Sequence, residues 1–203
     1  MKKGIFLILA SILIFSYTDT YAQEAYSTPS VYKVTINRFR LSSDGGVTWI
    51  TVSDSSTEFD IASVNAGAAV GNFFGGSIQP GTYNRYERTV SATFKMQGFM
   101  LNAVGVNDYY TSTTAANGTN FTANFDQNNP PADYGEATIT IFGYNQGDSL
   151  PAEQEIVNIA LQSGATKKVN IDFNVTNTLA LYNIGGGAYQ IMPAPPRVTV
   201  TVE

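Results

Sequence analysis

Cysteine and histidine are both absent from this sequence of 203 residues. Without cysteine, no disulfide can form and no lipid can be attached to an N-terminal thiol, so packing and hydrogen bonds must stabilise the fold. Zinc sites built on histidine or cysteine, Ser-His-Asp triads and Cys-His dyads are excluded as well. The sequence contains no motif typical of a cofactor site, so we expect no cofactor.

Charge is scarce, since charged residues make up 13% of the chain and its formal net charge is −5. No segment concentrates lysine or arginine, so nucleic acids and anionic membrane surfaces are not expected partners. The polar surface must come mostly from Thr, Ser, Asn, Gln and Tyr, a composition common in exported β proteins.

Long apolar runs are absent after the N-terminus. Lys2 and Lys3 precede an apolar run at 5–15, and Thr20-Tyr21-Ala22 resembles a small-residue cleavage site. The run is too short to span roughly 30 Å of hydrocarbon as a helix, so a retained membrane anchor is the weaker alternative. We therefore predict a signal peptide at 1–22, export to the periplasm, outer surface or medium, and no membrane insertion after its removal.

After an extended leader at 23–30, the chain from 31 to 203 reads as one β domain. Its clearest stretch follows Pro80-Gly81, a turn signal in which glycine can take the positive φ of a type II turn. Apolar residues then alternate with polar ones, which predicts a long strand at 84–96 with one buried face. Arg88 interrupts the apolar side, and Glu87 falls on the polar, solvated side.

Further strands are predicted by alternation and by turn residues. They lie at 31–41, 47–53, 99–106, 109–113, 120–125, 137–144, 155–161, 168–176, 188–192 and 197–203. The strands at 109–113 and 120–125 are expected to pair as a hairpin around Asn117-Gly118, a strong turn dipeptide. A Gly- and Ala-rich crossing is expected at 65–76 and a turn at Ser163-Gly164. A change of phase near Asn37-Arg38 predicts a bulge in the first of them. Many short strands without a sustained helical period favour an all-β fold, an antiparallel two-sheet sandwich of immunoglobulin-like or prealbumin-like type.

The turn between the first two strands contains Ser42-Ser43-Asp44-Gly45-Gly46-Val47-Thr48-Trp49. It resembles the Asp-box hairpin of sialidases and other propeller proteins, in which the box is structural. The Asp44 side chain can accept bonds from nearby amides while Gly46 takes positive φ and Trp49 packs beneath the turn. Because one copy is present and a propeller needs several, we interpret the box as a structural turn.

Three segments together resemble the bacterial exported family known as domain of unknown function 4382. They are the opening strand with its tryptophan hairpin (31–52), Phe59-Asp60-Ile61 through to Pro80-Gly81-Thr82-Tyr83, and Val169 to Val175 continuing to the final valine strand. The family tends to have Asp-Phe-Asp in the third segment, where this chain has Asn174 as the second position of the pair. The resemblance implies an exported β-sandwich and supplies no activity.

Pro80-Gly81-Thr82-Tyr83 followed by Glu87 also resembles pilus sandwich domains that form Lys–Asn isopeptide bonds. Lys33 and either Asn170 or Asn174 would complete such a triad. The reaction needs a buried acid and a neutral lysine. Since alternation places Glu87 on the polar face, we favour a solvated strand face instead.

The sequence contains residues for two further kinds of site. Asp126, Asn128, Asn129 and Asp133 form an oxygen-rich loop that is a weak calcium candidate, although its spacing does not match an EF-hand and turn formation explains the residues as well. Glu58, Asp60, Glu87 and Asp172 are the acids open to a carboxylate-based glycan hydrolase, but none lies in a motif that requires this role.

Aromatic residues in the middle region suggest a carbohydrate-binding surface, because flat rings stack on sugars. The candidates are Tyr109, Tyr110, Phe121, Tyr134 and Tyr144. Core packing is the simpler explanation for any single ring. We predict an exported, non-catalytic structural or interaction module with glycan or protein partners at the cell surface. The alternatives are a carbohydrate-binding module and a glycan hydrolase. Self-association could use an unpaired edge strand such as 197–203.

Overall fold

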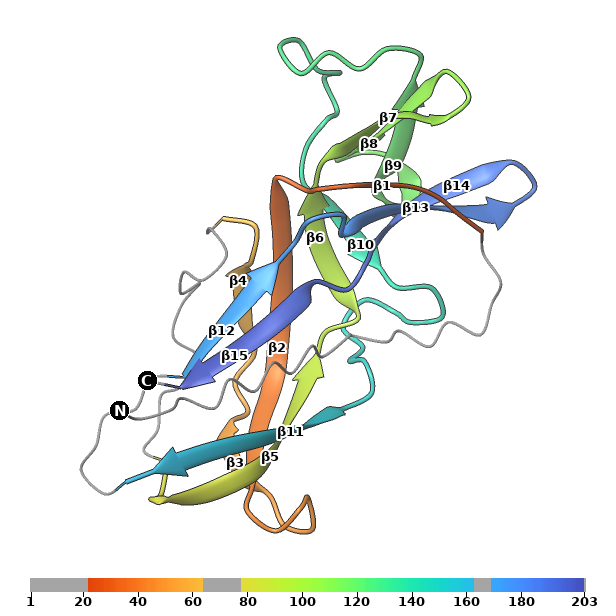
Figure 1. The fold of residues 1–203 in the computed structure, drawn as a ribbon. Helices are drawn as coiled ribbons and strands as arrows, with labels where there is room; N and C mark the ends of the chain where they lie inside the picture. The colour runs from red at the N-terminus through yellow and green to blue at the C-terminus, as the bar shows by residue number, and fades with distance from the viewer. Residues whose placement is uncertain (1–21, 64–77, 163–168, 203) are drawn as a thin grey trace.

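The computed structural model describes residues 22–63, 78–162 and 169–202. The predicted signal peptide, except Ala22, lies outside the described residues, as do the Gly- and Ala-rich crossing at 65–76 and the predicted Ser163-Gly164 turn. The described strands pair antiparallel and pack as an all-β sandwich, which confirms the predicted fold class (Figure 1).

Strand β2, Val31–Ser42, is the centre of the main sheet. Its Lys33 lies opposite Asp60 of one neighbour and Lys95 of another, so shorter strands flank it on both sides. One side carries β3 and β4, the other carries β5 and β6, and β11 and β10 lie outside the latter two. Their bounds are Ile50–Ser53 (β3), Thr57–Asp60 (β4), Gly81–Val90 (β5), Thr93–Gln97 (β6), Ala137–Thr140 (β10) and Glu153–Leu161 (β11).

The predicted long strand at 84–96 is present but divided into β5 and β6. The two pieces run along β2 and are separated at Ser91, which forms an isolated bridge with Ser149. The register between β2 and β5 shifts between Ile36 and Arg38, which confirms the predicted bulge in β2. The apolar side of the run is buried as predicted, at Tyr86, Val90, Ala92, Phe94 and Met96.

The turn expected at Pro80-Gly81 is wrong in one respect. Gly81 is the first residue of β5, lies opposite Leu161 of β11, and is not among the residues with positive φ. The backbone is already extended there because pairing with β11 begins at this residue. The entry to the strand is instead fixed by the Tyr83 hydroxyl, which donates to the carbonyl of Gln79 at 2.8 Å.

The second layer is a long hairpin interrupted halfway. Its legs are β12 with β13 and β14 with β15, and the Ala194 amide donates to the Thr178 carbonyl at 2.7 Å where each leg is broken. Figure 1 shows β12 and β15 crossing in front of β2. The bounds are Val169–Asn174 (β12), Leu179–Gly185 (β13), Ala188–Pro193 (β14) and Arg197–Val202 (β15).

The structure bears on two predictions about the chain ends in this layer. Strand β15 pairs with β12 along its length, from Asn174 opposite Arg197 to Val169 opposite Val202, and with no other described strand, so 197–202 is paired on one side and remains an edge strand. The leader at 23–30 is extended as expected, but most of it belongs to β1, Ala22–Ser27, which pairs with β13. The polar residues of the leader are accommodated because β1 is the outer strand of its three-stranded sheet.

Strands β7, β8 and β9 form a small separate sheet at the end of β6, which we call the cap (Figure 1). They span Phe99–Val104, Asn107–Thr111 and Thr119–Thr122, with a short 3-10 turn at Ala116–Gly118. The predicted hairpin around Asn117-Gly118 is confirmed, since Tyr109 lies opposite Phe121. Gly118 has φ +67°, and a Cβ there would lie 2.5 Å from that of Ala137, so the position requires glycine.

Tyr32 of β2 joins the two layers in the core. The residue is fully buried, its ring meets Phe94 edge-on at 6.0 Å, and its hydroxyl donates to the carbonyl of Ala194 at 3.3 Å. Apolar residues of both layers pack around it, among them Val34, Val90, Met96, Leu179, Leu181 and Ile191.

The Asp44 hairpin has the local geometry that the sequence predicts. Asp44 accepts hydrogen bonds from the amides of Val47 and Thr48 at 3.1 and 2.9 Å, and Gly46 has φ +96°. Trp49 lies under the turn, where a Cβ on Gly46 would come within 3.2 Å of its ring. The returning strand β3 begins at Ile50 rather than at Val47, because the turn itself uses the intervening residues.

Candidate functional site

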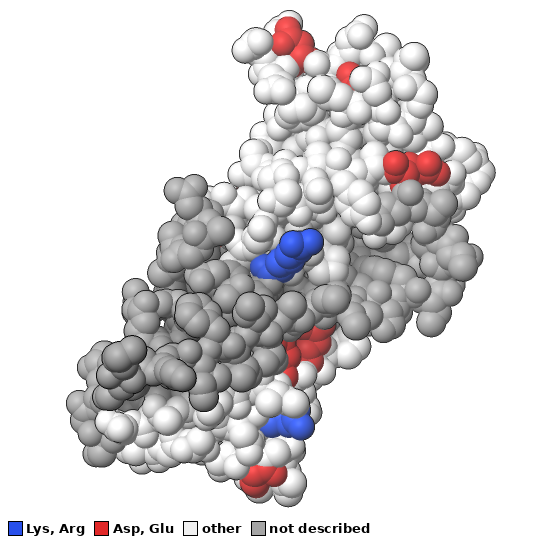
Figure 2. All heavy atoms as spheres, in the orientation of Figure 1, with Lys and Arg blue, Asp and Glu red and all other residues white. Residues whose placement is uncertain are grey.

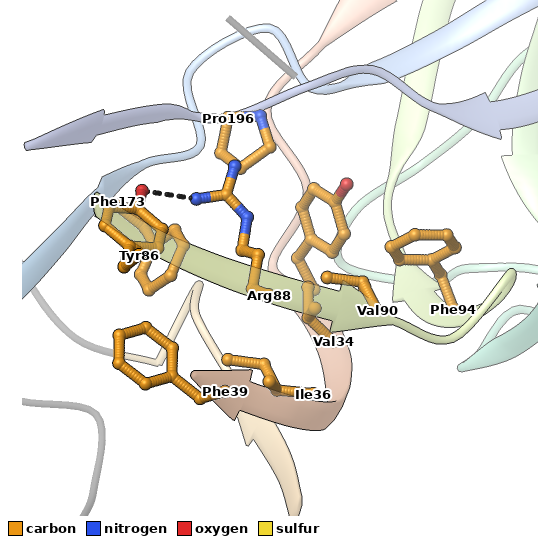
Figure 3. A pocket seen from close by; sticks show the side chains of 10 residues that line it. Val34, Ile36, Phe39, Tyr86, Arg88, Val90, Phe94, Phe173 and Pro196 are labelled. Carbon is orange, nitrogen blue, oxygen red and sulfur yellow. Dashed lines mark hydrogen bonds between the residues drawn. The ribbon is translucent and has the colours of Figure 1, made fainter. Parts of the chain in front are cut away.

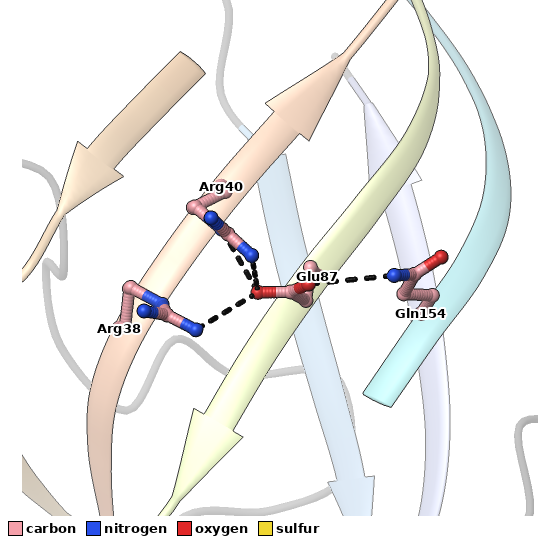
Figure 4. A network of polar contacts seen from close by, with 4 residues as sticks. All are labelled: Arg38, Arg40, Glu87 and Gln154. Carbon is pink, nitrogen blue, oxygen red and sulfur yellow. Dashed lines mark hydrogen bonds and ion pairs between the residues drawn. The ribbon is translucent and has the colours of Figure 1, made fainter. Parts of the chain in front are cut away.

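Glu87 of β5 is a buried acid, and its predicted exposure on a solvated face is wrong. Only 3% of the residue is accessible. Its Oε1 accepts from the Arg40 Nε at 2.8 Å and from the Arg38 Nη2 at 3.3 Å, while the Gln154 Nε2 lies 3.4 Å from Oε2 (Figure 4). Two arginines from β2 and a glutamine from β11 cover the carboxylate. The alternation of Glu87 is as predicted, but its face is covered by long side chains rather than by water.

Arg88, the next residue, is buried on the opposite face of β5. Its Nη2 lies 2.8 Å from Glu153 and its Nη1 lies 2.8 Å from Glu155, both on β11. The Nη1 group also donates to the Tyr86 hydroxyl at 2.7 Å. Burial raises the pKa of the Glu153 carboxyl, and the nearby Arg88 partly offsets this effect. The break that Arg88 makes in the apolar pattern is therefore an ion-pair site between β5 and β11.

We call these two arrangements together the β5–β11 clamp, consisting of Glu87 with Arg38, Arg40 and Gln154, and Arg88 with Glu153 and Glu155. On one face, two ion pairs of Arg88 fix the N-terminal half of β11 to β5, and on the other face Glu87 is held by arginines of β2 and contacts β11 through Gln154. The Arg88 pairs hold their geometry because their charges lose compensation if β5 and β11 separate.

A small cavity of about 40 Å³ lies between the main sheet and the second layer (Figure 3). Arg88 is its one charged lining residue, and Phe173 and Pro196 close it from the second layer. The remaining lining residues are Tyr32, Val34, Ile36, Phe39, Tyr86, Val90 and Phe94. A space of this size holds only a few water-sized molecules, and we interpret it as a packing gap beside Arg88.

The described residues do not bring the isopeptide triad together. Lys33 pairs with Glu136 rather than with Glu87. The hydrogen bond to Glu136 raises the pKa of the Lys33 amino group, whereas the reaction needs a neutral amine. Asn174 is exposed and accepts from the Thr176 amide at 2.9 Å, while the side chain of Asn170 lies outside the described residues.

Tyr109 and Tyr110 do not form the predicted sugar-stacking surface, since they are 5% and 4% exposed. They are consecutive residues of β8 and point to opposite faces of the cap, both of which are covered. Tyr109 packs against Tyr189 at 5.4 Å between ring centroids, and Tyr110 packs against Phe125 at 5.8 Å. Core packing is thus the role of this pair.

The other three candidate rings do not lie together as a platform. Phe121 is 60% exposed on β9. Tyr134 is partly buried and meets Phe125 edge-on at 5.0 Å, while Tyr144 packs against the main core. Only Phe121 among the five candidates presents an open ring.

The oxygen-rich loop is organised by its own hydrogen bonds. Asp133 accepts from the Ser112 hydroxyl at 2.6 Å, from the Tyr110 hydroxyl at 3.0 Å and from the Asn120 amide at 3.1 Å. The Ser112 bond, followed by the Asn120 and Tyr110 bonds, lowers the pKa of the Asp133 carboxyl. Asp126 instead closes a turn with the Asn128 amide at 2.9 Å.

Asp133 thus joins cap strands, whereas Asp126, Asn128 and Asn129 belong to an exposed turn. Within the described ranges, no three acidic side chains are grouped as metal ligands. The calcium candidate consequently gains no support from the geometry.

The remaining acids named for hydrolase chemistry are engaged elsewhere. Glu58 pairs with Lys95 at 2.9 Å. Asp60 accepts from the amides of Tyr32 and Ala62 at 3.1 and 3.2 Å. The side chain of Asp172 lies outside the described residues. The structure does not place two of the described acids across a cavity.

Strand β11 has one open edge. It pairs with β5 alone, and in the parts of the chain that the structure describes no strand lies on its other side. Exposed side chains alternate along its outer face at Gln154, Ile156, Asn158 and Ala160. Ile156 is 55% exposed. A strand edge with alternating exposed side chains is a template for strand addition.

Charge on the visible surface is sparse. Figure 2 shows single charged side chains scattered over the described part of one face, with neither sign gathered into a patch. Among the described residues, no helix is both long enough and apolar enough to cross a membrane.

No family model, curated protein or solved structure matches the chain. The resemblance to the family known as domain of unknown function 4382 therefore stays a prediction.

Sequence reasoning missed the clamp and the open edge. The signal for Arg88 was present, because a single cation in an apolar strand face requires a buried counter-charge. Glu153 and Glu155 share one face of a later strand and were available as partners. Which strand would lie outermost could not be read from alternation, since it depends on strand order.

Proposed function

We propose that this chain is an exported, non-catalytic interaction module that binds its partner along the open edge of β11. The supporting observation is that edge: nine residues, Glu153–Leu161, which pair on one side only within the described part of the chain and are held to β5 by Arg88 of the clamp. A rigid edge offers backbone donors and acceptors in a fixed row, so a partner strand can add to it with little ordering cost.

The use of the acidic side chains also supports a non-catalytic role. Glu58, Glu87, Glu153 and Glu155 are paired with lysine or arginine. Catalytic carboxylates in glycosidases instead face each other across the substrate. Export rests on the predicted signal peptide, and the periplasm, outer surface and medium remain open as destinations.

Site-specific cross-linking tests the proposed edge. A photo-reactive amino acid replaces Ile156 in cells that export the full chain, and the control places it at Leu101, which is 52% exposed on the cap. We expect an adduct of discrete mass from position 156, identified by peptide mass, and none of the same mass from position 101. Equal adducts at both positions, or none at 156, would contradict the proposal.

Carbohydrate binding is the second candidate function. It is supported by the exposed ring of Phe121, because an exposed aromatic ring can stack on a sugar. Polysaccharide pull-down should compare the wild type with Phe121→Ala, because Tyr109→Ala and Tyr110→Ala would disturb the buried cap. Binding that is lost in Phe121→Ala would favour this candidate. Release of sugar products from the bound glycan would instead indicate a hydrolase.

A further inference from the structure

We propose that the partner of β11 is β11 of a second copy of this chain, paired antiparallel across a two-fold axis beside Ile156. This inference rests on the proposed function and names the partner of the same edge. Two identical strands that pair antiparallel form an isologous contact, in which each surface is its own complement. The main sheets of the two copies would then join into one continuous sheet.

The edge has a bulge after Ile156 but lacks two other features that commonly keep edge strands apart, lysine and proline. Exposed edges are commonly protected by lysine or proline. Strand β11 reads Glu-Gln-Glu-Ile-Val-Asn-Ile-Ala-Leu and contains neither. Its two acids, Glu153 and Glu155, both pair with Arg88 on the inner face, which offsets part of their charge and holds both carboxylates toward β5.

The charge pattern selects the position of the axis. With the axis beside Ile156, Ile156 faces its own copy, Gln154 faces Asn158 and Glu155 faces Val157. Moving the axis by one residue to Glu155 would place two carboxylates opposite each other, which is unfavourable. The selected register instead pairs two isoleucines that are each 55% exposed in the single chain, and it places amide side chains opposite each other on either side.

The bulge in β11 sets the length of this contact. The register with β5 shifts between Ile156 and Ile159, so the strand bends just after Ile156. The shared ladder is therefore short, and we expect a reversible dimer whose amount rises with protein concentration.

Disulfide trapping tests the axis directly, because the chain has no cysteine of its own. The Ile156→Cys variant should form a covalent dimer under mild oxidation, since two copies of the position face each other. Leu101→Cys is the matched control, with a similarly exposed side chain on a different sheet. Dimer formation by Ile156→Cys at least ten times faster than by Leu101→Cys is expected. Equal rates would overturn the inference.

A second measurement avoids the introduced thiol. Light scattering or sedimentation of the exported chain should show a concentration-dependent dimer. Ile156→Lys should abolish it and Leu101→Lys should leave it unchanged, because a lysine at the axis faces another lysine. A wild type that stays monomeric, or a dimer that survives Ile156→Lys, would overturn the inference. A cross-link from position 156 to a different protein would still support the proposed function, so the two failures can be told apart.

Discussion

The β5–β11 clamp and the cap bury acidic side chains in opposite ways. In the clamp, Glu87, Glu153 and Glu155 meet arginines, so charge is neutralised by charge. In the cap, Asp108 and Asp133 meet neutral donors. Asp108 accepts from the amides of Asn102 and Phe125 at 2.7 and 2.6 Å, and Asp133 accepts from hydroxyl groups and an amide side chain.

This difference determines what each region tolerates. Removing Arg88 from the clamp leaves Glu153 and Glu155 without a cation, which is among the most destabilising kinds of change in proteins. Removing one donor from an aspartate of the cap leaves the other donors in place, so the loss is that of one hydrogen bond. The ion pairs between β5 and β11 therefore depend on a single residue, Arg88. In the cap, each aspartate accepts several hydrogen bonds that can be lost one at a time.

The largest effect is expected from Arg88→Met, which keeps the length of the side chain but leaves Glu153 and Glu155 without a cation. We expect a loss of about 3 kcal/mol in the free energy of unfolding. Burial raises the pKa of Glu153, and without Arg88 that pKa should rise further. A raised acid pKa gives stability that is lost as pH increases, so the variant should lose less at pH 4 than at pH 7.

Chemical denaturation at both pH values measures this effect. The control is Arg88→Met combined with Glu153→Gln and Glu155→Gln, in which the charges are removed together. The cost of Arg88→Met in that background should fall by more than half, because the isolated charges are gone. A single variant as stable as the wild type would show that the clamp does not depend on charge compensation.

A smaller effect is expected in the cap from Asp133→Asn. An amide cannot accept from Ser112, Tyr110 and Asn120 as the carboxylate does, and the loss should be about 2 kcal/mol at neutral pH. Since these bonds lower the pKa of Asp133, its contribution is present above the unfolded-state value of about 3.9 and is lost as pH falls further. The difference in stability between the wild type and Asp133→Asn should therefore disappear below that pH.

Thermal unfolding measured from pH 7 down to pH 2 gives the stability difference between the two proteins at each pH. Asp126→Asn is the matched control, because Asp126 lies in the same loop but accepts only within an exposed turn. A pH-independent gap for Asp133→Asn, or an equal loss in Asp126→Asn, would contradict the assigned role.

Alternation predicted most of the strands but missed β4 and β13, and it predicted the surroundings of the strands poorly. The buried side of 84–96, the bulge in β2 and the hairpin at Asn117-Gly118 all follow from local sequence, because side-chain period and turn chemistry are local properties. Glu87 was assigned to the correct face but to the wrong environment. Whether a face meets water depends on which long side chains cross it, and Arg38 and Arg40 come from another strand.

The candidate sites show the same limit. Tyr109 and Tyr110 lie in the predicted strand, yet both faces of that strand are covered, one of them by Tyr189 from the second layer. The open edge of β11 could not be predicted at all, since pairing partners far apart in the chain decide which strand is outermost. The local sequence pattern thus predicts the strands, whereas the position of the candidate site depends on the order of the strands in the sheet.

A third variant, Asp44→Ala, tests whether a structural turn at the surface contributes to stability as the clamp or the cap does. The hydrogen bonds from Thr48 lower the pKa of Asp44, which keeps it ionised and bound to the turn amides. The turn itself is exposed, with Val47 81% accessible, so we expect a local change and little change in global stability. Trp49 is the one tryptophan of the chain, so its emission should shift to the red and become easier to quench by iodide. Asp54→Ala is the control, and identical spectra for the two variants would contradict the role of Asp44.

The smallest effect is expected from Lys33→Met, which removes a charge pair from the outer face of the main sheet. Lys33 and Glu136 have side-chain exposures of 28% and 33%, so water can replace the lost partner. We expect a change within about 0.5 kcal/mol, weaker still in high salt. The pair raises the pKa of Lys33, so its contribution is complete below the ordinary value near 10.4 and disappears only at higher pH. Denaturation at pH 7 should therefore give Lys33→Met a loss of stability close to that of Lys95→Met, whose pair with Glu58 is more exposed still, and far smaller than that of Arg88→Met. If Lys33→Met cost as much as Arg88→Met, then burial would not distinguish the clamp from an ordinary surface pair, and the rigidity attributed to β11 would lose its physical basis.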